Sequence, residues 1–224
     1  MRRPSPSRAT RWRVGGVEQP GIRHNGILTD RAAPDPCEDR PVVELRGATP
    51  ADAHAIATVQ VASWRVAYRG LMPDEVLAGL SVPDVERVWL GRLTTPKPRT
   101  RTVLAAAGAT VFGFAATGPP LVAEDSSDPA LGDLYAIYLH PDVWGRGLGT
   151  RLHAAALDGL RDCGFTRAGL WVLDGNERAL RFYRREGWTD TGRTQVDRGP
   201  DDIELHERRL QRYPASPASG PPGQ

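Results

Sequence analysis

Three glycines at alternate positions, Gly145, Gly147 and Gly149, follow an apolar strand pattern and precede a strongly helical one. Glycines allow close approach to backbone N–H groups, and the N-terminus of the following helix presents unpaired donors at its positive dipole end. Such a junction predicts an anion site for a phosphate or diphosphate, with Arg146 or Arg151 as a nearby cation. The plainer interpretation is a tight turn, with Gly149 allowing close packing of helix on sheet.

The glycine spacing excludes two common nucleotide-binding patterns. No Lys-Ser or Lys-Thr pair follows, as a Walker phosphate loop requires, and the spacing is not the G-x-G-x-x-G of dinucleotide-binding folds. No pair of metal-binding carboxylates accompanies the turn, which disfavours a phosphotransferase and predicts no metal site.

A second group of residues lies on a predicted helix at 177–186. Asn176 directly precedes this helix and is a good N-cap; a role as a ligand is the alternative, and both can hold at once. Tyr183 lies about two turns after Asn176, so the two share one helix face, and the small Ala179 between them leaves room for a ligand.

Both segments resemble motifs of the GNAT superfamily of N-acetyltransferases. The family pattern Q/R-x-x-G-x-G/A follows a strand and cradles the diphosphate of acyl-CoA; here the turn reads WGRGLG, with Trp144 where the family usually has Gln or Arg. The second family pattern, N-x-x-A-x-x-F-Y-x-x-x-G-F, matches at every named position, with Trp188 as the final aromatic residue. The segment WRVAYRGLMP at 64–73 also resembles the first helical region of such enzymes, so the resemblance covers residues 42–210.

The resemblance implies acetyl-CoA as co-substrate and assigns roles to several residues. Tyr183 is implied as the general acid that protonates the departing thiolate; the alternative is a buried tyrosine bonded to a backbone carbonyl. The strand before the glycine turn is implied to bind the pantetheine arm, with a main-chain N–H polarising the thioester carbonyl. The residues expected to bind the co-substrate are Ile137, Tyr138, Leu139, Trp144, Gly145, Arg146, Gly147, Leu148, Gly149, Thr150, Asn176 and Tyr183.

The general base is a more open question. Asp133 lies on the predicted strand at 131–139, where some relatives carry an acidic residue, but a solvated carboxylate at the strand end is an equal alternative. Alternation along the strand predicts that Asp133, Tyr135, Ile137 and Leu139 share one face. His140 is the other titratable group nearby, and it fits a turn that ends the strand.

The acceptor is expected to be a small-molecule or peptide amine whose identity the sequence does not encode. Trp64, Tyr68 and Tyr135 are candidates to line its pocket, or they belong to the core. Neither Cys37 nor Cys163 is set as a nucleophile, which predicts direct attack by the amine in a ternary complex. The alternative function is a non-catalytic acyl-CoA-binding sensor or interaction protein.

The elements that position these residues follow from changes in hydrophobic periodicity. Their order, β-α-α-α-β-β-β-α-β-α-β-β, predicts an α+β fold with a mixed, mostly antiparallel central sheet and flanking helices. The strand–helix–strand unit at 131–173 is expected to be parallel, with the ligand crevice at its first turn. The predicted strands are 42–46, 100–107, 110–117, 131–139, 169–173, 188–196 and 203–210; the predicted helices are 50–68, 73–80, 82–93, 146–163 and 177–186, with a polar loop at 119–129.

Composition narrows the remaining classes. A chain of 224 residues with 40% hydrophobic residues and a net charge of +2 fits one folded domain and gives no reason to expect nucleic acid or a membrane as partner. Two cysteines offer no disulfide framework, which favours a cytoplasmic location. The proline-rich segments 1–41 and 211–224 are predicted to be disordered around an N-acetyltransferase domain at 42–210. A homodimer is compatible with the sequence.

Overall fold

A computed structural model describes residues 42–212. Seven strands form one sheet in the order β1-β2-β3-β4-β5-β7-β6, and every neighbouring pair is antiparallel except β4 and β5. The segments 1–41 and 213–224, predicted to be disordered, lie outside the described residues, whereas Gln211 and Arg212 belong to the last strand. The strands are β1 (Glu44–Gly47), β2 (Arg101–Ala107), β3 (Thr110–Gly118), β4 (Leu131–Leu139), β5 (Arg167–Leu173), β6 (Thr189–Arg198) and β7 (Glu204–Arg212).

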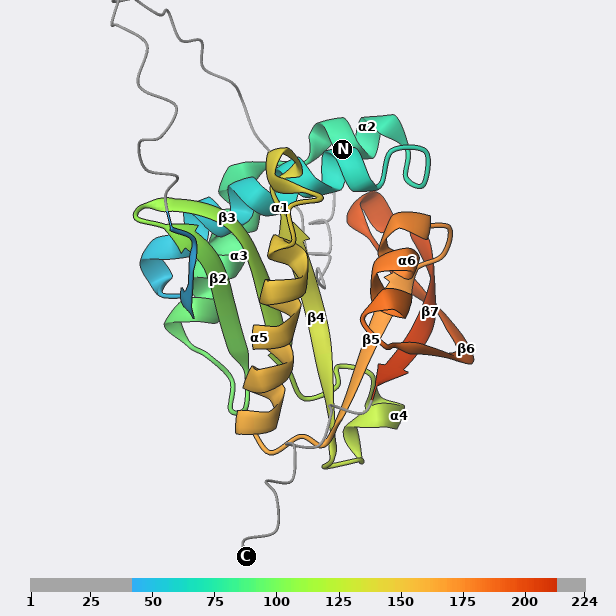
Figure 1. The fold of residues 1–224 in the computed structure, drawn as a ribbon. Helices are drawn as coiled ribbons and strands as arrows, with labels where there is room; N and C mark the ends of the chain where they lie inside the picture. The colour runs from blue at the N-terminus through green and yellow to red at the C-terminus, as the bar shows by residue number, and fades with distance from the viewer. Residues whose placement is uncertain (1–41, 213–224) are drawn as a thin grey trace, which may run out of the picture.

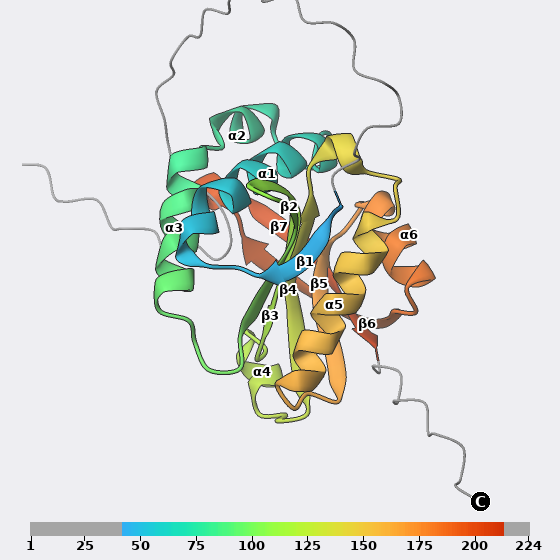
Figure 2. The same ribbon diagram turned by 60° about the vertical axis from the view of Figure 1, so that its left-hand side comes forward.

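Helices cover both faces of the sheet (Figure 1; Figure 2). Helices α1, α2 and α3 pack on one face through a core that includes Trp89 and Phe114, and α5 and α6 pack on the other face with Leu152 and Leu170. No helix within 42–212 has the length and apolarity needed to cross a membrane. The helices are α1 (Ala53–Ala67), α2 (Asp74–Gly79), α3 (Val82–Thr94), α4 (Ala123–Ser126), α5 (Leu148–Asp162) and α6 (Glu177–Arg185).

The predicted α+β fold with a mixed, mostly antiparallel sheet is confirmed. Besides small shifts at the ends of other elements, two local differences from the sequence expectation have a clear physical reason. The one-turn helix α4 lies in the segment predicted as a polar loop, because four residues carry no helical periodicity to detect. Helix α5 begins at Leu148 rather than at residue 146, because Gly147 before it has a left-handed backbone, with φ of 77°.

The parallel strands β4 and β5 pair over a short stretch and then separate (Figure 1). The paired segment of β4 runs from Leu131 to Asp133, opposite Arg167 to Gly169. Beyond it, β4 remains bonded to β3 on its other side, and β5 to β7. Within the described part of the chain, the edge of β4 that faces β5 therefore has no strand partner from 134 to 139, directly before the glycine turn.

A β-bulge interrupts β4 at Tyr135. Ala136 lies opposite Ala116 on β3, and Leu134 lies opposite Thr117, so Tyr135 is an extra residue between two consecutive partners. An inserted residue of this kind bends the strand and reverses the alternation of side chains past it.

The bulge corrects one prediction about β4. Ile137 and Leu139 pack against the core cluster of α5 and α6, whereas Tyr135 and Tyr138 pack against the cluster of α1, α2 and α3. The expectation that Asp133, Tyr135, Ile137 and Leu139 share one face is therefore wrong, because alternation holds only in an uninterrupted strand.

Candidate active site

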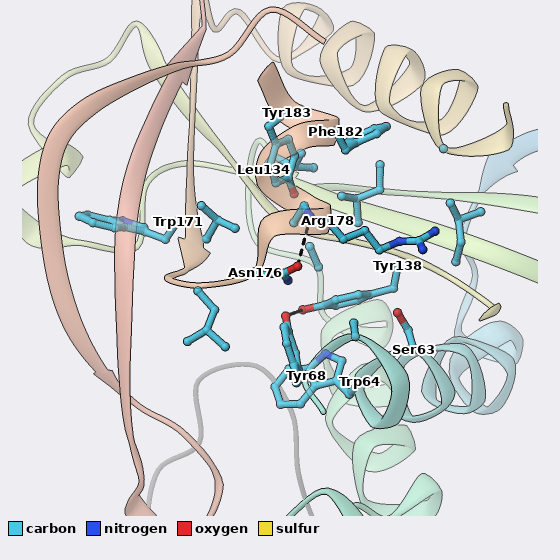
Figure 3. Close-up of a pocket in the computed structure, with 18 of the residues that line it drawn as sticks. Ser63, Trp64, Tyr68, Leu134, Tyr138, Trp171, Asn176, Arg178, Phe182 and Tyr183 are labelled. Atoms are coloured by element: carbon cyan, nitrogen blue, oxygen red, sulfur yellow. Dashed lines mark hydrogen bonds between the residues drawn. The ribbon is translucent and has the colours of Figure 1, made fainter. Parts of the chain in front are cut away.

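A pocket of about 730 Å³ opens where β4 and β5 separate. Its walls come from these strands, the glycine turn, α6, the end of α1, and the inner face of the β6–β7 hairpin. Figure 3 shows Tyr183 and Arg178 from α6, Tyr138 from β4, and Trp64 and Tyr68 from α1 around it. All but two of the site residues predicted from the sequence line this pocket. The exceptions are Arg146, whose side chain is exposed, and Leu148, which is buried in the core. The residues that the pocket brings together are Trp64, Tyr68, Asp133, Tyr135, Ile137, Tyr138, Leu139, Trp144, Gly145, Gly147, Gly149, Thr150, Asn176 and Tyr183.

The glycine turn has the conformation of an anion site. Gly145 and Gly147 have φ of 75° and 77°, a left-handed backbone that other residues adopt only at a cost, and both have open space around the Cα atom. Arg151 donates its backbone N–H to the Gly147 carbonyl at 3.3 Å, so the amides of 148–150 are the unpaired first donors of helix α5. Gly149 has a packing role as well, since a Cβ there would lie 3.2 Å from Leu139 Cδ1.

Trp144, at the position where a Gln or Arg was expected from the family pattern, connects the turn to its neighbours. Its indole Nε1 donates a 2.9 Å hydrogen bond to the Leu139 carbonyl at the end of β4. The guanidinium carbon of Arg178, on α6, lies 3.8 Å from the centre of the Trp144 ring, a cation–π arrangement. Arg178 lines the pocket beside Gly145 and Gly147, although sequence reasoning gave it no role.

Helix α6 presents Asn176 and Tyr183 to the same pocket (Figure 3). Asn176 is the predicted N-cap: its Oδ1 accepts a 3.1 Å hydrogen bond from the Ala179 amide, which leaves its Nδ2 group free of that bond. Tyr183 is 9% exposed, and its hydroxyl forms no hydrogen bond with another residue of 42–212. Burial raises the pKa of Tyr183 well above its usual value, so the hydroxyl stays protonated and can donate.

Aromatic side chains line the side of the pocket next to α1. The hydroxyls of Tyr68 and Tyr138 lie 3.3 Å apart, and the Trp64 ring packs edge-on against Tyr68 with centroids 5.0 Å apart (Figure 3). Tyr135 also lines the pocket, but its hydroxyl donates a short hydrogen bond to the Pro119 carbonyl. Three of these rings therefore form a wall with polar groups, and Tyr135 contributes mainly its ring.

Asp133 lines the pocket, but both of its carboxylate oxygens are already bonded. They accept hydrogen bonds of 3.0 and 2.7 Å from the two terminal nitrogens of Arg209, which is fully buried. Arg209 also pairs with Asp125 of α4 at 3.1 Å, and Arg193 of β6 donates to Asp125 at 2.6 Å. This network joins α4 to the β6–β7 hairpin, and it leaves neither carboxylate oxygen of Asp133 without a donor.

A second carboxylate, which sequence reasoning missed, enters the pocket from the hairpin. Glu207 of β7 lies opposite Gln195 of β6, whose Nε2 donates a 2.6 Å hydrogen bond to it. Burial raises the pKa of Glu207; the Gln195 hydrogen bond opposes the rise, and the nearby charge of Asp197 adds to it. Alternation from Leu205 is the sequence signal that points Glu207 inward, because Leu205 packs against the core.

The two ends of the pocket are lined by side chains of opposite charge. Arg178, Arg181 and Arg185 line it near the glycine turn, whereas Asp197 and Glu207 line it on the hairpin. Across residues 42–212, neither of these two carboxylates forms an ion pair.

Two other titratable residues considered from the sequence lie apart from this chemistry. His140 caps a short 3₁₀ turn at Pro141–Val143 and accepts a 3.4 Å hydrogen bond from the Asp142 amide, as expected of a turn residue. Cys163 lies at the C-cap of α5 and does not line the pocket. In the part of the chain that the structure describes, no three His, Cys, Asp or Glu side chains are grouped to hold a metal ion.

Comparison with known proteins agrees with the fold and the turn. The model of the acetyltransferase (GNAT) family matches residues 64–188. The chain is 32% identical over 145 residues to the uncharacterized N-acetyltransferase YuaI of Bacillus subtilis strain 168, a match that covers 64% of this chain and 78% of that protein.

Solved structures with bound CoA or acetyl-CoA share the fold. The paiA N-acetyltransferase from Thermoplasma acidophilum, in complex with coenzyme A, superposes with a TM-score of 0.57 at 17% identity, covering 77% of this chain and 99% of that one. The protein yncA from Salmonella typhimurium, with its cofactor acetyl-CoA, gives a TM-score of 0.54 at 18% identity, covering 80% and 99%. Together with the family match, these findings show that the chain belongs to the acetyltransferase (GNAT) family.

Proposed function

We propose that this protein is an acetyl-CoA-dependent N-acetyltransferase that transfers the acetyl group directly to a primary amine in a ternary complex. The observation that carries the proposal is one pocket that joins the glycine turn to Tyr183 and to Glu207, a carboxylate that forms no ion pair within 42–212. An anion site, a proton donor and a proton acceptor in one cavity are the groups that this reaction needs.

The glycine turn and β4 hold acetyl-CoA. The free amides of the turn and of the first turn of α5 bind the diphosphate, as helix N-termini bind anions. The edge of β4 that β5 leaves free presents main-chain groups of Ile137, Tyr138 and Leu139 to the pantetheine arm. One N–H on this edge stabilises the negative charge that develops on the thioester oxygen.

Tyr183 serves as the general acid. Its raised pKa keeps the proton on the hydroxyl, and the lack of a competing partner within 42–212 leaves that proton available to the sulfur. As the amine nitrogen bonds to the carbonyl carbon, the C–S bond breaks and the electron pair leaves on sulfur, which Tyr183 protonates. The proton that the nitrogen loses as the amide forms restores the Tyr183 hydroxyl.

Glu207 serves as the general base in preference to Asp133. An incoming ammonium group must lose a proton before it attacks, and a carboxylate without a cation partner accepts one more readily than a carboxylate whose oxygens are both bonded to arginine. Burial raises the pKa of both carboxylates, but Glu207 has no cation partner within 42–212, whereas both oxygens of Asp133 are bonded to Arg209. Glu207 then releases its proton to solvent.

The acceptor is an amine that is cationic at neutral pH. Asp197 and Glu207, which form no ion pair within the described residues, give the hairpin end of the pocket a negative charge that attracts such a group. The rings of Trp64 and Tyr68 offer an apolar wall, and the ring of Tyr135 also lines the pocket.

The test is amine-dependent release of CoA thiol from acetyl-CoA, measured with a panel of small-molecule and peptide amines. We expect thiol release to follow amine concentration, and we expect no acetylated enzyme by mass spectrometry without amine. Binding of acetyl-CoA with no transfer to any amine would support the alternative, a non-catalytic acyl-CoA sensor. A stable acetyl-enzyme would exclude direct transfer.

A further inference from the structure

Trp144 and Arg178 form a contact between the glycine turn and α6. The Arg178 guanidinium lies over the Trp144 ring at 3.8 Å, and Trp144 is itself fixed by the 2.9 Å bond from its Nε1 to the Leu139 carbonyl. The indole is therefore a rigid platform, held by β4, on which the guanidinium of a neighbouring helix rests.

This platform places a cation beside the free amides of the turn. Arg178 lines the pocket with Gly145, Gly147 and Trp144, on the same side of the cavity (Figure 3 shows Arg178 reaching across it). No hydrogen bond or ion pair from the Arg178 guanidinium to another residue of 42–212 is formed, so its donors are free for a ligand. The side chain of Arg146, in the turn itself, is exposed and does not line the cavity.

We infer that Arg178 is a ligand of the CoA diphosphate, and that Trp144 acts as the positioning residue that holds it there. The cation that the turn lacks at position 144 thus comes from α6, and guanidinium is well suited to phosphate because it offers paired donors. The inference rests on the proposed use of acetyl-CoA.

Calorimetric titration of the full chain with CoA tests the inference. Arg178→Ala should weaken CoA binding about 10- to 100-fold, the size expected for one charge-assisted contact. Trp144→Leu should weaken it less, because the guanidinium remains but loses its platform. Arg184→Ala is the matched control: Arg184 is an exposed arginine on the same helix that does not line the pocket, so its loss should leave CoA affinity unchanged.

Titration with 3′-dephospho-CoA identifies the phosphate involved. An Arg178 bound to the diphosphate loses the same factor for CoA and for 3′-dephospho-CoA. A loss confined to CoA would assign Arg178 to the 3′-phosphate and overturn the inference.

A rescue experiment separates a direct contact from a change in folding. In the Arg178→Ala background, Trp144→Arg returns a cation to the turn and should recover most of the lost CoA affinity. The double variant must have the same unfolding temperature as the Arg178→Ala protein; if it does and CoA affinity is not recovered, the inference is contradicted. An Arg178→Ala protein whose CoA affinity is unchanged would also contradict it. If the wild-type chain itself binds no CoA, the proposed function fails instead.

Discussion

Gln195 and Glu207 lie opposite each other on β6 and β7, and the Gln195 side-chain amide donates a 2.6 Å hydrogen bond to the Glu207 carboxylate. This bond stabilises the ionised carboxylate, while burial favours the protonated one, so the pair sets the pKa of the pocket's unpaired acid. Activity that depends on Glu207 as a base must therefore depend on Gln195 and on pH.

Replacement of the proposed base should slow the reaction. We expect Glu207→Gln to lower kcat/KM for the amine by about 10²-fold or more at neutral pH, because the carboxylate proposed to accept the ammonium proton is removed. Steady-state thiol release with varied amine checks this. The control is Asp201→Asn, which removes one negative charge from the exposed tip of the same hairpin and should leave kcat/KM unchanged.

The acid limb of the pH profile should report the same group. Activity should fall as the pH drops through the Glu207 pKa, which lies above the usual value for glutamate, because protonation removes the base. Gln195→Leu deletes a hydrogen bond that lowers this pKa, so the acid limb should move to higher pH. An acid limb that stays in place in this variant would argue that another group titrates.

Loss of the Tyr183 hydroxyl should affect chemistry more than binding. Tyr183→Phe keeps the ring, which packs 5.8 Å from Trp188, so the fold should persist. We expect turnover to fall about 10²- to 10⁴-fold with CoA affinity nearly unchanged, since only the proton donor is removed. Parallel measurement of kcat and of the CoA Kd decides it; equal turnover in both proteins would assign Tyr183 a packing role.

Asp133→Asn should destabilise the protein. The substitution leaves Arg209 buried with a neutral neighbour, and loss of one partner from a buried pair costs about 3–5 kcal/mol; Asp125 remains 3.1 Å away and should keep the loss near the lower value. Urea unfolding measures this. If the variant instead keeps its stability and loses the acid limb of its pH profile, Asp133 is the base.

The left-handed backbone conformation of Gly147 should be necessary for CoA binding, even though there is room for a side chain at this position. At Gly147 an added Cβ meets no atom within 4 Å, but φ of 77° strains any other residue, and we expect Gly147→Ala to raise the CoA Kd roughly tenfold by shifting the amides. Gly192→Ala is the matched control, with φ of 76° and equally open surroundings away from the pocket. It should lose stability and keep its CoA affinity.

Local sequence patterns predicted the parts of the site that lie close together along the chain. The alternate glycines, the cap at Asn176 and the shared face of Asn176 and Tyr183 depend on turn and helix chemistry within a few residues, and the structure contains the turn and the cap as expected. The order of strands and helices followed from the same local periodicity, apart from the single turn of α4.

Contacts between distant segments were not predictable in this way. The bulge at Tyr135 shows itself only in the register with β3, and the bond from Arg209 to Asp133 depends on β7 entering the sheet beside β5. The sequence distance between Asp133 and Glu207 likewise hides the fact that both line one pocket. Long-range strand pairing, which local pattern does not encode, therefore decided which carboxylate stays free.

The central claim is that the turn before α5 binds the CoA diphosphate so that the thiol end reaches Tyr183. Amide chemical shifts in a ¹H–¹⁵N correlation spectrum, recorded during titration with CoA, test it most directly. The account predicts large, saturable shifts for the amides of 145–150, with smaller shifts at the exposed tip of the β6–β7 hairpin. A titration that saturates elsewhere and leaves the amides of 145–150 unchanged would contradict it.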